Sequence, residues 1–199
     1  MNQSAFHLDV YACVLAAGKS SRFGATKLVQ PFQGLPLLQK ALVAAQGACK
    51  DRVLLVVGHD QGSVVEASAG LFDRLVVNNE FGSGINSSIA ASIRSCQDDA
   101  DAVIVMLADQ PLVSAAHIRD LIGTWSGADN EIVSTSFDGI TSPPILFPKS
   151  AFPALLKLRG DSGAKSLLSN DTFVVTSVDF PPAGFDIDRP EDLCQIDQD

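Results

Sequence analysis

The sequence feature that most constrains the fold is a series of short apolar runs separated by helical segments. Residues 10–15, 53–57 and 102–107 are runs of five or six uncharged, mostly aliphatic residues. Runs of this length and composition are typical of strands buried on both faces, as in a parallel sheet with helices on both sides. We therefore expect an α/β protein with a three-layer α/β/α Rossmann-like fold and a mainly parallel sheet.

The spacing of apolar residues and helix-capping signals predicts where the other elements lie. Strands are expected at 10–15, 53–57, 74–77, 102–107, 131–134, 145–147 and 173–178. Helices are expected at 37–46, 61–69, 86–96, 114–124, 151–158 and 162–168. A last helix opens at Pro190, since proline suits the first turn of a helix. No repeat or linker divides the chain, so we expect one nucleotidyltransferase domain over residues 1–199 with a short tail at 1–9.

Composition excludes several classes of protein. With 46% hydrophobic and 19% charged residues, the chain has the composition of a folded enzyme. Its apolar runs are too short to cross a bilayer, and residues 1–9 contain no basic residue or apolar signal core. We expect a cytoplasmic protein with no membrane partner. The four cysteines are far apart with no C-x-x-C pair, which favours buried thiols over a zinc site.

Charge is distributed unevenly along the chain. The net charge of −9 argues against broad nucleic-acid binding, so no nucleic-acid partner is expected. Residues 1–60, however, carry six of the 14 basic residues and only three of the 23 acidic ones. A polyphosphate would be attracted to this part of the chain.

A loop rich in small and basic residues follows the first expected strand. Leu15 closes the strand, and Ala16, Ala17 and Gly18 are small enough for the backbone to approach a base or phosphate closely. Backbone N–H groups in such a turn can form an anion-binding concavity. Arg22 offers a planar charged fork and Lys27 a mobile charge for triphosphate oxygens. An ordinary strand-to-helix turn with surface cations is the alternative.

Two commoner phosphate-binding motifs each lack one required glycine. Gly18-Lys19-Ser20 looks like the end of a P-loop, but Cys13 stands where its first glycine is required. Gly82-Ser83-Gly84 would begin a dinucleotide fingerprint, but Ser87 stands at the third glycine position. A P-loop kinase and an ordinary Rossmann dehydrogenase are both disfavoured.

Carboxylates at two places predict a magnesium site. Asp109 follows the strand at 102–107, and Mg²⁺ in proteins prefers one or two carboxylates together with substrate phosphates and water. Near the C-terminus, Asp186 and Asp188 flank Ile187, so both carboxylates point to one side of an extended segment. Asp188 is expected to be the second metal ligand, with Asp186 as the alternative. Each aspartate could instead serve as a helix cap or turn residue.

Together, these segments resemble the nucleotidyltransferases that mature the molybdenum cofactor, especially the molybdenum cofactor cytidylyltransferase branch. The resemblance covers residues 10–193, and four motifs in the right order carry it: LAAGKSSRFGATK at 15–27, ADQP at 108–111, GDSGAK at 160–165 and DIDRPEDL at 186–193. The family also includes sugar-phosphate nucleotidyltransferases and a reductase that uses a nicotinamide nucleotide.

The resemblance implies roles for particular residues. Arg22, Lys27 and Asp109 are expected to be catalytic, and Asp109 and Asp188 to hold Mg²⁺. The nucleotide-binding residues would be Leu15, Ala16, Ala17, Gly18, Lys27, Gly82, Ser87 and Ser88. Pro143, Pro144 and Asp161 are assigned to the acceptor, although the family's usual Gly-His-Pro is here Ser142-Pro143-Pro144.

The implied reaction is transfer of CMP from CTP to the phosphate of molybdopterin, with release of pyrophosphate. Ala17 favours CTP, because the guanylyltransferase branch usually has a second glycine there. Implied partners are a molybdoenzyme or its chaperone. The alternatives are another phosphorylated acceptor such as a sugar phosphate, GTP in place of CTP, and a nucleotide-binding chaperone without catalysis.

Overall fold

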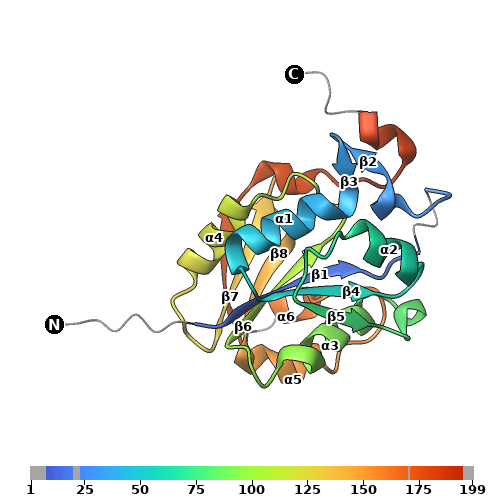
Figure 1. Ribbon diagram of the computed structural model, residues 1–199. Helices are drawn as coiled ribbons and strands as arrows, with labels where there is room; N and C mark the ends of the chain where they lie inside the picture. The colour runs from blue at the N-terminus through green and yellow to red at the C-terminus, as the bar shows by residue number, and fades with distance from the viewer. Residues whose placement is uncertain (1–7, 20–22, 170, 195–199) are drawn as a thin grey trace.

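A seven-stranded sheet forms the centre of the protein in a computed structural model that describes residues 8–19, 23–169 and 171–194 (Figure 1). The strand order is β5-β4-β1-β6-β8-β7-β9. Six of these strands are parallel, and only β8 runs antiparallel to its neighbours. The strands are β1 (Val10–Ala16), β4 (Val53–Val57), β5 (Arg74–Val77), β6 (Ala102–Leu107), β7 (Glu131–Phe137), β8 (Ile140–Pro148) and β9 (Val174–Asp179). A separate hairpin pairs β2 (Pro31–Phe32) with β3 (Leu35–Pro36).

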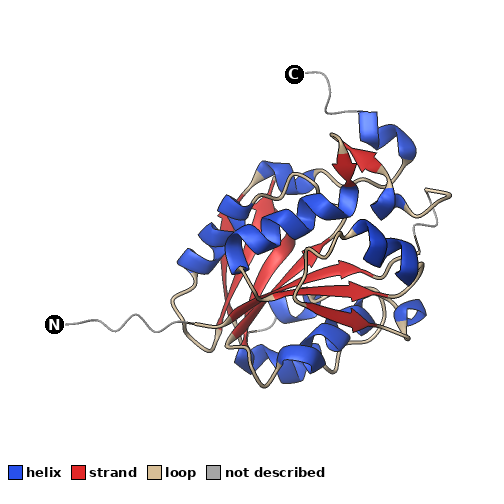
Figure 2. Cartoon of the chain, in the orientation of Figure 1, coloured by secondary structure: helices blue, strands red, loops and turns tan. Residues whose placement is uncertain are grey.

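Helices cover both faces of the sheet. One face carries α1 (Leu37–Cys49), α2 (Gln61–Ala67) and α4 (Ala115–Thr124). The other carries α3 (Ile85–Cys96), α5 (Phe152–Leu155) and α6 (Lys165–Leu168). Figure 2 shows the strands enclosed between these two layers. The expected three-layer fold with a mainly parallel sheet is confirmed.

Strand side chains alternate between the two cores. In β1, Ala12 and Val14 belong to the core beneath α1 and α4, whereas Cys13 and Leu15 belong to the core beneath α3. Because side chains alternate along a strand, a strand covered on both faces must be apolar at every position. The cysteines at 13, 49 and 96 are buried in these cores, and burial raises the pKa of the Cys49 thiol to about 12.

The order in which successive strands are added to the sheet reverses next to β1. From β1 the chain passes through α1 to β4 and β5 on one side, and through α3 to β6 on the other. The loops that leave β1 and β6 therefore diverge, and open α/β sheets bind ligands at such a switch point. A hydrogen bond of 3.2 Å from the Ala108 N–H to the Leu15 carbonyl joins the loop after β6 to the end of β1.

The first helix is longer than the sequence pattern predicts. It was expected to end near Gly47 but continues to Cys49. Gly47 acts here in helix packing rather than as a stop signal: a Cβ at this position would lie 2.8 Å from Cβ of Ala115 in α4. The absence of a side chain lets the two helices approach closely.

Five other elements in the C-terminal part of the chain differ from expectation. The helices expected at 151–158 and 162–168 shorten to single turns, with η3 (Lys149–Ala151) preceding α5. The segment after Pro190 is a 3₁₀ helix, η5 (Pro190–Cys194). Strands β7 and β8 are longer than predicted and form a hairpin around the two-residue turn Asp138-Gly139, a sequence typical of tight hairpins.

The 3₁₀ helices η1 (Lys27–Val29) and η2 (Phe81–Ser83) border the sheet edge where β1 and β6 end. A further 3₁₀ helix, η4 (Pro181–Gly184), follows β9.

Among the described residues, no helix is long and apolar enough to cross a membrane.

A buried histidine links α4 to β7 and β8. His117 is 2% exposed, and its ring stacks on that of Phe180 with centroids 4.0 Å apart. Its Nε2 lies 2.8 Å from Oγ1 of Thr135, whose hydroxyl donates to the carbonyl of Pro144. Because the threonine proton is used in this way, Nε2 of His117 must be the donor, so the neutral ring carries its proton on Nε2. Burial lowers the pKa of His117.

This arrangement predicts a loss of stability in mild acid. The depressed pKa means that the unfolded chain binds a proton at higher pH than the folded chain. The neutral His117 ring therefore does not reduce the free energy of unfolding at pH values well above its unfolded pKa of about 6.5. As the pH falls below that value, the free energy of unfolding should decrease by up to about 1.4 kcal/mol per pH unit.

The test is urea unfolding of the wild type and His117→Gln at several pH values between 7.5 and 5. Glutamine keeps an N–H donor but does not titrate, so its stability should fall less steeply with acid. Equal slopes for the two proteins would contradict the assignment.

Candidate functional site

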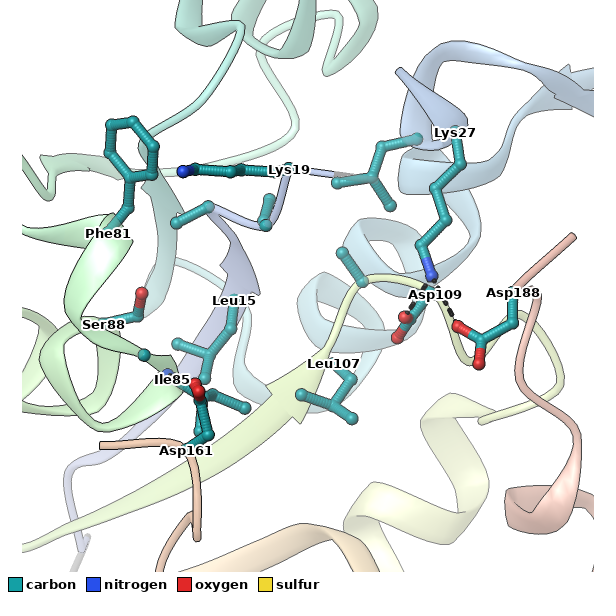
Figure 3. Close-up of a pocket in the computed structure, with 16 residues that line it drawn as sticks. Leu15, Lys19, Lys27, Phe81, Ile85, Ser88, Leu107, Asp109, Asp161 and Asp188 are labelled. Atoms are coloured by element: carbon teal, nitrogen blue, oxygen red, sulfur yellow. Dashed lines mark hydrogen bonds and ion pairs between the residues drawn. The ribbon is translucent and has the colours of Figure 1, made fainter. Parts of the chain in front are cut away.

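A pocket of about 530 Å³ opens at the switch point, at the carboxyl ends of β1 and β6 (Figure 3). Its walls come from four parts of the chain: the end of β1 with the loop after it, the start of η1, the region from η2 into α3, and the end of β6. Asp161 and Asp188 complete it. Lys27 and Asp188, which are 161 residues apart in the sequence, thus meet in one cavity.

The loop after β1 forms the floor of the pocket. Leu15, Ala16 and Ala17 are buried, and Ala17 lies against Gly58. A Cβ at Gly58 would be 3.0 Å from Cβ of Ala17 and 2.7 Å from Cβ of Phe81, so this glycine lets three segments meet. Gly18, in contrast, faces open space, and its N–H makes no backbone hydrogen bond within the described part of the chain.

Lys27 is the central cation of the site. It begins η1, which Leu28 anchors in the core. Its ammonium lies 2.7 Å from Oδ2 of Asp109, 2.7 Å from the carbonyl of Ile187 and 3.3 Å from Oδ1 of Asp188. The Lys27 side chain is 13% exposed and that of Asp109 is 24% exposed, so this ion pair is screened less than a surface pair, whereas Asp188 is half exposed.

The C-terminal segment reaches this lysine because Ile187 is fully buried. Its N–H donates to the carbonyl of Asp109 at 3.1 Å, which ties the segment to the loop after β6. Asp188 then lines the pocket beside Lys27, whereas Asp186 does not line it. Burial, followed by the charge of Asp109, raises the pKa of Asp186. The backbone N–H groups of Asp188 and Arg189 donate to Asp192.

The first turn of α3 forms another wall. Ser88 lines the pocket, and Asn78, which follows β5, donates to Oγ of both Ser87 and Ser88 at 2.8 and 3.0 Å. The side chain of Asn78 also accepts from the Glu80 N–H. The buried amide of Asn78 therefore sets the orientation of this turn.

A second loop is pressed against the same helix end. Oδ1 of Asp161 accepts from the Ile85 N–H at 3.1 Å, and the carbonyls of Gly160 and Arg159 accept from the backbone N–H and side-chain amide of Asn86. The contact is so close that a Cβ on Gly84 would lie 2.4 Å from Oδ1 of Asp161. Asp161 thus caps a helix from another part of the chain.

Most of the residues assigned to the site from the sequence meet in this pocket. Those that line it are Leu15, Ala16, Ala17, Gly18, Lys27, Ser88, Asp109, Asp161 and Asp188. Gly82, Ser87, Pro143 and Pro144 do not, and Ser87 instead borders a neighbouring cavity on the outer side of α3. Arg22 lies outside the described residues. The roles of all these residues remain predictions.

Sequence reasoning missed several residues of the pocket. Phe81 lines it and lies beneath the ammonium of Lys19, 5.7 Å from the ring centroid. Its position directly before Gly82-Ser83-Gly84 is the only signal in the sequence. Ile85 and Leu107 also contribute apolar wall, and nothing in the sequence distinguishes them from core residues.

Pro143 and Pro144 lie near the pocket without lining it. They belong to β8, just beyond Ile145, which pairs with Val105 of β6. Next to them, Nε2 of the buried Gln110 donates to Oγ of Ser142 at 3.2 Å and to the carbonyl of Ala183 at 3.0 Å. This segment therefore adjoins the loop that carries Asp109.

The donor set around Lys27 suits a divalent cation that is shared with a substrate. Among the described residues, no group of three or more His, Cys, Asp or Glu side chains could hold a metal. Asp109 and Asp188, however, converge on one point, and Mg²⁺ is commonly held by one or two carboxylates plus phosphate oxygens. The pocket is lined by two lysines and three aspartates, so a divalent cation would make its charge positive.

The mainly parallel sheet, with a pocket at its switch point, places the protein among the Rossmann-like α/β proteins. Within that class, the chain belongs to the MobA-like NTP transferase domain family, whose model matches residues 12–180.

Individual relatives align along nearly the whole chain. The chain is 32% identical over 193 residues to the purine catabolism protein PucB of Bacillus subtilis (strain 168), covering 92% of this chain and 93% of PucB. It is 26% identical to the nicotine blue oxidoreductase of Paenarthrobacter nicotinovorans, covering 94% and 96%. The crystal structure of Rv0371c from Mycobacterium tuberculosis H37Rv superposes with a TM-score of 0.80 at 27% identity, covering 94% and 96%.

The contact between Gly84 and the 159–161 loop generates a prediction about stability. Gly84 has a φ of +97°, and a Cβ there would also lie 2.5 Å from the backbone of Gly160. We expect Gly84→Ala to lower the free energy of unfolding by at least about 1–3 kcal/mol, as for other substitutions in strained conformations.

Gly82→Ala is the matched control, because a Cβ at Gly82 meets nothing within 4 Å and the residue has no positive φ. Urea unfolding of both variants measures the difference. Equal stabilities would show that the loop does not pack against α3 as described.

Proposed function

We propose that the protein transfers CMP from CTP to the phosphate of molybdopterin and releases pyrophosphate. The observation that carries this proposal is the position of the Lys27 ammonium between Asp109 and Asp188, at one end of a nucleotide-sized pocket. Family membership supports nucleotidyl transfer, and Ala17, on the pocket floor, favours cytosine over guanine.

In this reaction an oxygen of the acceptor phosphate attacks the α-phosphorus of CTP, and the bond to the β-phosphate breaks. The acceptor is already anionic, so no strong general base is required. The enzyme's contribution is to align the two phosphates and to neutralise their charge. Lys27 would bind phosphate oxygens of the triphosphate and of the leaving pyrophosphate, and Arg22 is assigned the same task.

Asp109 and Asp188 would hold Mg²⁺, which supplies charge neutralisation to the phosphates when bound. Rv0371c of Mycobacterium tuberculosis has been crystallised as a complex with manganese, which supports a divalent-cation requirement in this family. The two carboxylates already bracket a cation, Lys27, so the geometry favours a positive group between them.

The pocket also supports an orientation for the substrates. Lys27, Asp109 and Asp188 lie together on one side of it, and Ser88, Ile85 and Asp161 lie on the other (Figure 3). We place the triphosphate at the lysine and the base near α3. The acceptor would approach past Asp109, along β8 at Pro143 and Pro144, and the product would pass to a molybdoenzyme or its chaperone.

The decisive experiment is a panel of CTP, GTP, UTP and ATP, with Mg²⁺ and molybdopterin, in which pyrophosphate release is followed. We expect pyrophosphate release with CTP and with none of the other three nucleotides, and no release after Mg²⁺ is chelated. Replacing molybdopterin by sugar phosphates provides the acceptor control.

Each alternative predicts a different pattern in this panel. A sugar-phosphate enzyme would release pyrophosphate with that acceptor, and a guanylyltransferase would do so with GTP. A nucleotide-binding chaperone would bind CTP but would not release pyrophosphate, whichever acceptor is present. Any of these results would overturn the proposal.

Variants of the central cluster test the assigned roles. We expect Asp109→Ala and Lys27→Ala to reduce pyrophosphate release by about 10²–10³-fold, the usual loss when one electrostatic contact to a transition state is removed. Circular dichroism should show an unchanged fold.

Lys149→Ala and Asp171→Ala are suitable controls, because both residues are exposed and lie outside the pocket. Near-normal activity of either cluster variant would contradict its catalytic role.

A further inference from the structure

We infer that Asp161 determines which base the pocket accepts, by accepting a hydrogen bond from an exocyclic amino group of the nucleotide. The inference rests on the proposed function, since it requires that a nucleoside triphosphate occupies the pocket. It concerns a residue that the sequence had assigned to the acceptor.

The position of Asp161 is the first argument. Its carboxylate lines the pocket beside Ile85, across from the cluster of Lys27, Asp109 and Asp188 (Figure 3). Pro143 and Pro144, the other residues assigned to the acceptor, adjoin Asp109 instead. Asp161 is therefore placed at the end of the pocket where the base would lie.

The second argument is that the carboxylate is held in place with one oxygen available. Oδ1 accepts from the Ile85 N–H, and no donor within the described residues reaches Oδ2. The flanking carbonyls of Gly160 and Arg159 both accept from Asn86, which fixes the loop to α3. A fixed acceptor at a binding site can discriminate between ligands, because its geometry does not adapt to the wrong one.

The third argument is charge. A carboxylate is an acceptor only, and it repels phosphate unless a cation lies beside it, as Lys27 lies beside Asp109 and Asp188, so the polyphosphate belongs at the lysine and not here. Cytosine presents an amino group at the position where uracil presents a carbonyl oxygen. A carboxylate attracts the former and repels the latter, so Asp161 favours CTP over UTP.

The test compares binding of CTP, UTP, GTP and ATP, each with Mg²⁺, to the wild type and to Asp161→Asn by isothermal titration calorimetry, and the CTP-to-UTP ratio is the main readout. Asparagine keeps the size and the oxygen that accepts from Ile85, but its amide adds N–H donors that suit uracil. A hydrogen bond to a charged group corresponds to about tenfold or more in affinity. We expect the wild type to prefer CTP by at least that factor, and the variant to lose the preference.

Ser162→Ala is the matched control, because Ser162 neighbours Asp161 on the same exposed loop and does not line the pocket. Its CTP-to-UTP ratio should equal that of the wild type. An unchanged ratio in a folded Asp161→Asn would refute the role of Asp161 and leave the proposed function standing.

Two other outcomes separate the inference from the function on which it rests. A wild type that binds none of the four nucleoside triphosphates would overturn the proposed function itself. If GTP binds more tightly than CTP and Asp161→Asn abolishes that preference, the role of Asp161 is supported and the choice of CTP is refuted.

Discussion

The ammonium group of Lys27 is the interaction on which the site depends. It joins three segments that are distant in the sequence: η1, the loop after β6, and the extended segment around Ile187. Without this cation, the carboxylates of Asp109 and Asp188, which lie on the same side of the pocket, would repel each other. The pocket sets two lysines against three aspartates, so in an acidic protein a divalent cation bound at this cluster would make the site positive enough for a polyphosphate.

The opposite wall depends on packing rather than on charge. Asn78 orients the serines that open α3, and the 159–161 loop closes over the end of that helix through Asp161 and Asn86. Gly84 makes this contact possible because it has no side chain. The two walls can therefore serve different parts of one ligand, with a charged end for phosphates and a polar, rigid end for a base.

Several elements could be predicted because they depend on local pattern. The boundaries of β4 and β6 agree with the apolar runs residue for residue, since a strand buried on both faces has a composition of its own. Those of the edge strand β5 agree as well, although it is largely exposed. The end of α1 could not be predicted, because Gly47 matters through its contact with Ala115, which is distant in the sequence. The hairpin at Asp138-Gly139 did have a local signal, which was overlooked.

By itself, the sequence determined the fold class, the loop after β1 and the carboxylates that a nucleotide site would need, because residue type and spacing encode these. Only the tertiary structure decided which of them meet. It brought Asp188 rather than Asp186 to Lys27, because burial of Ile187 sets the register of that segment. It also placed Asp161 against the start of α3, because contacts between segments distant in the sequence have no signature in the chain.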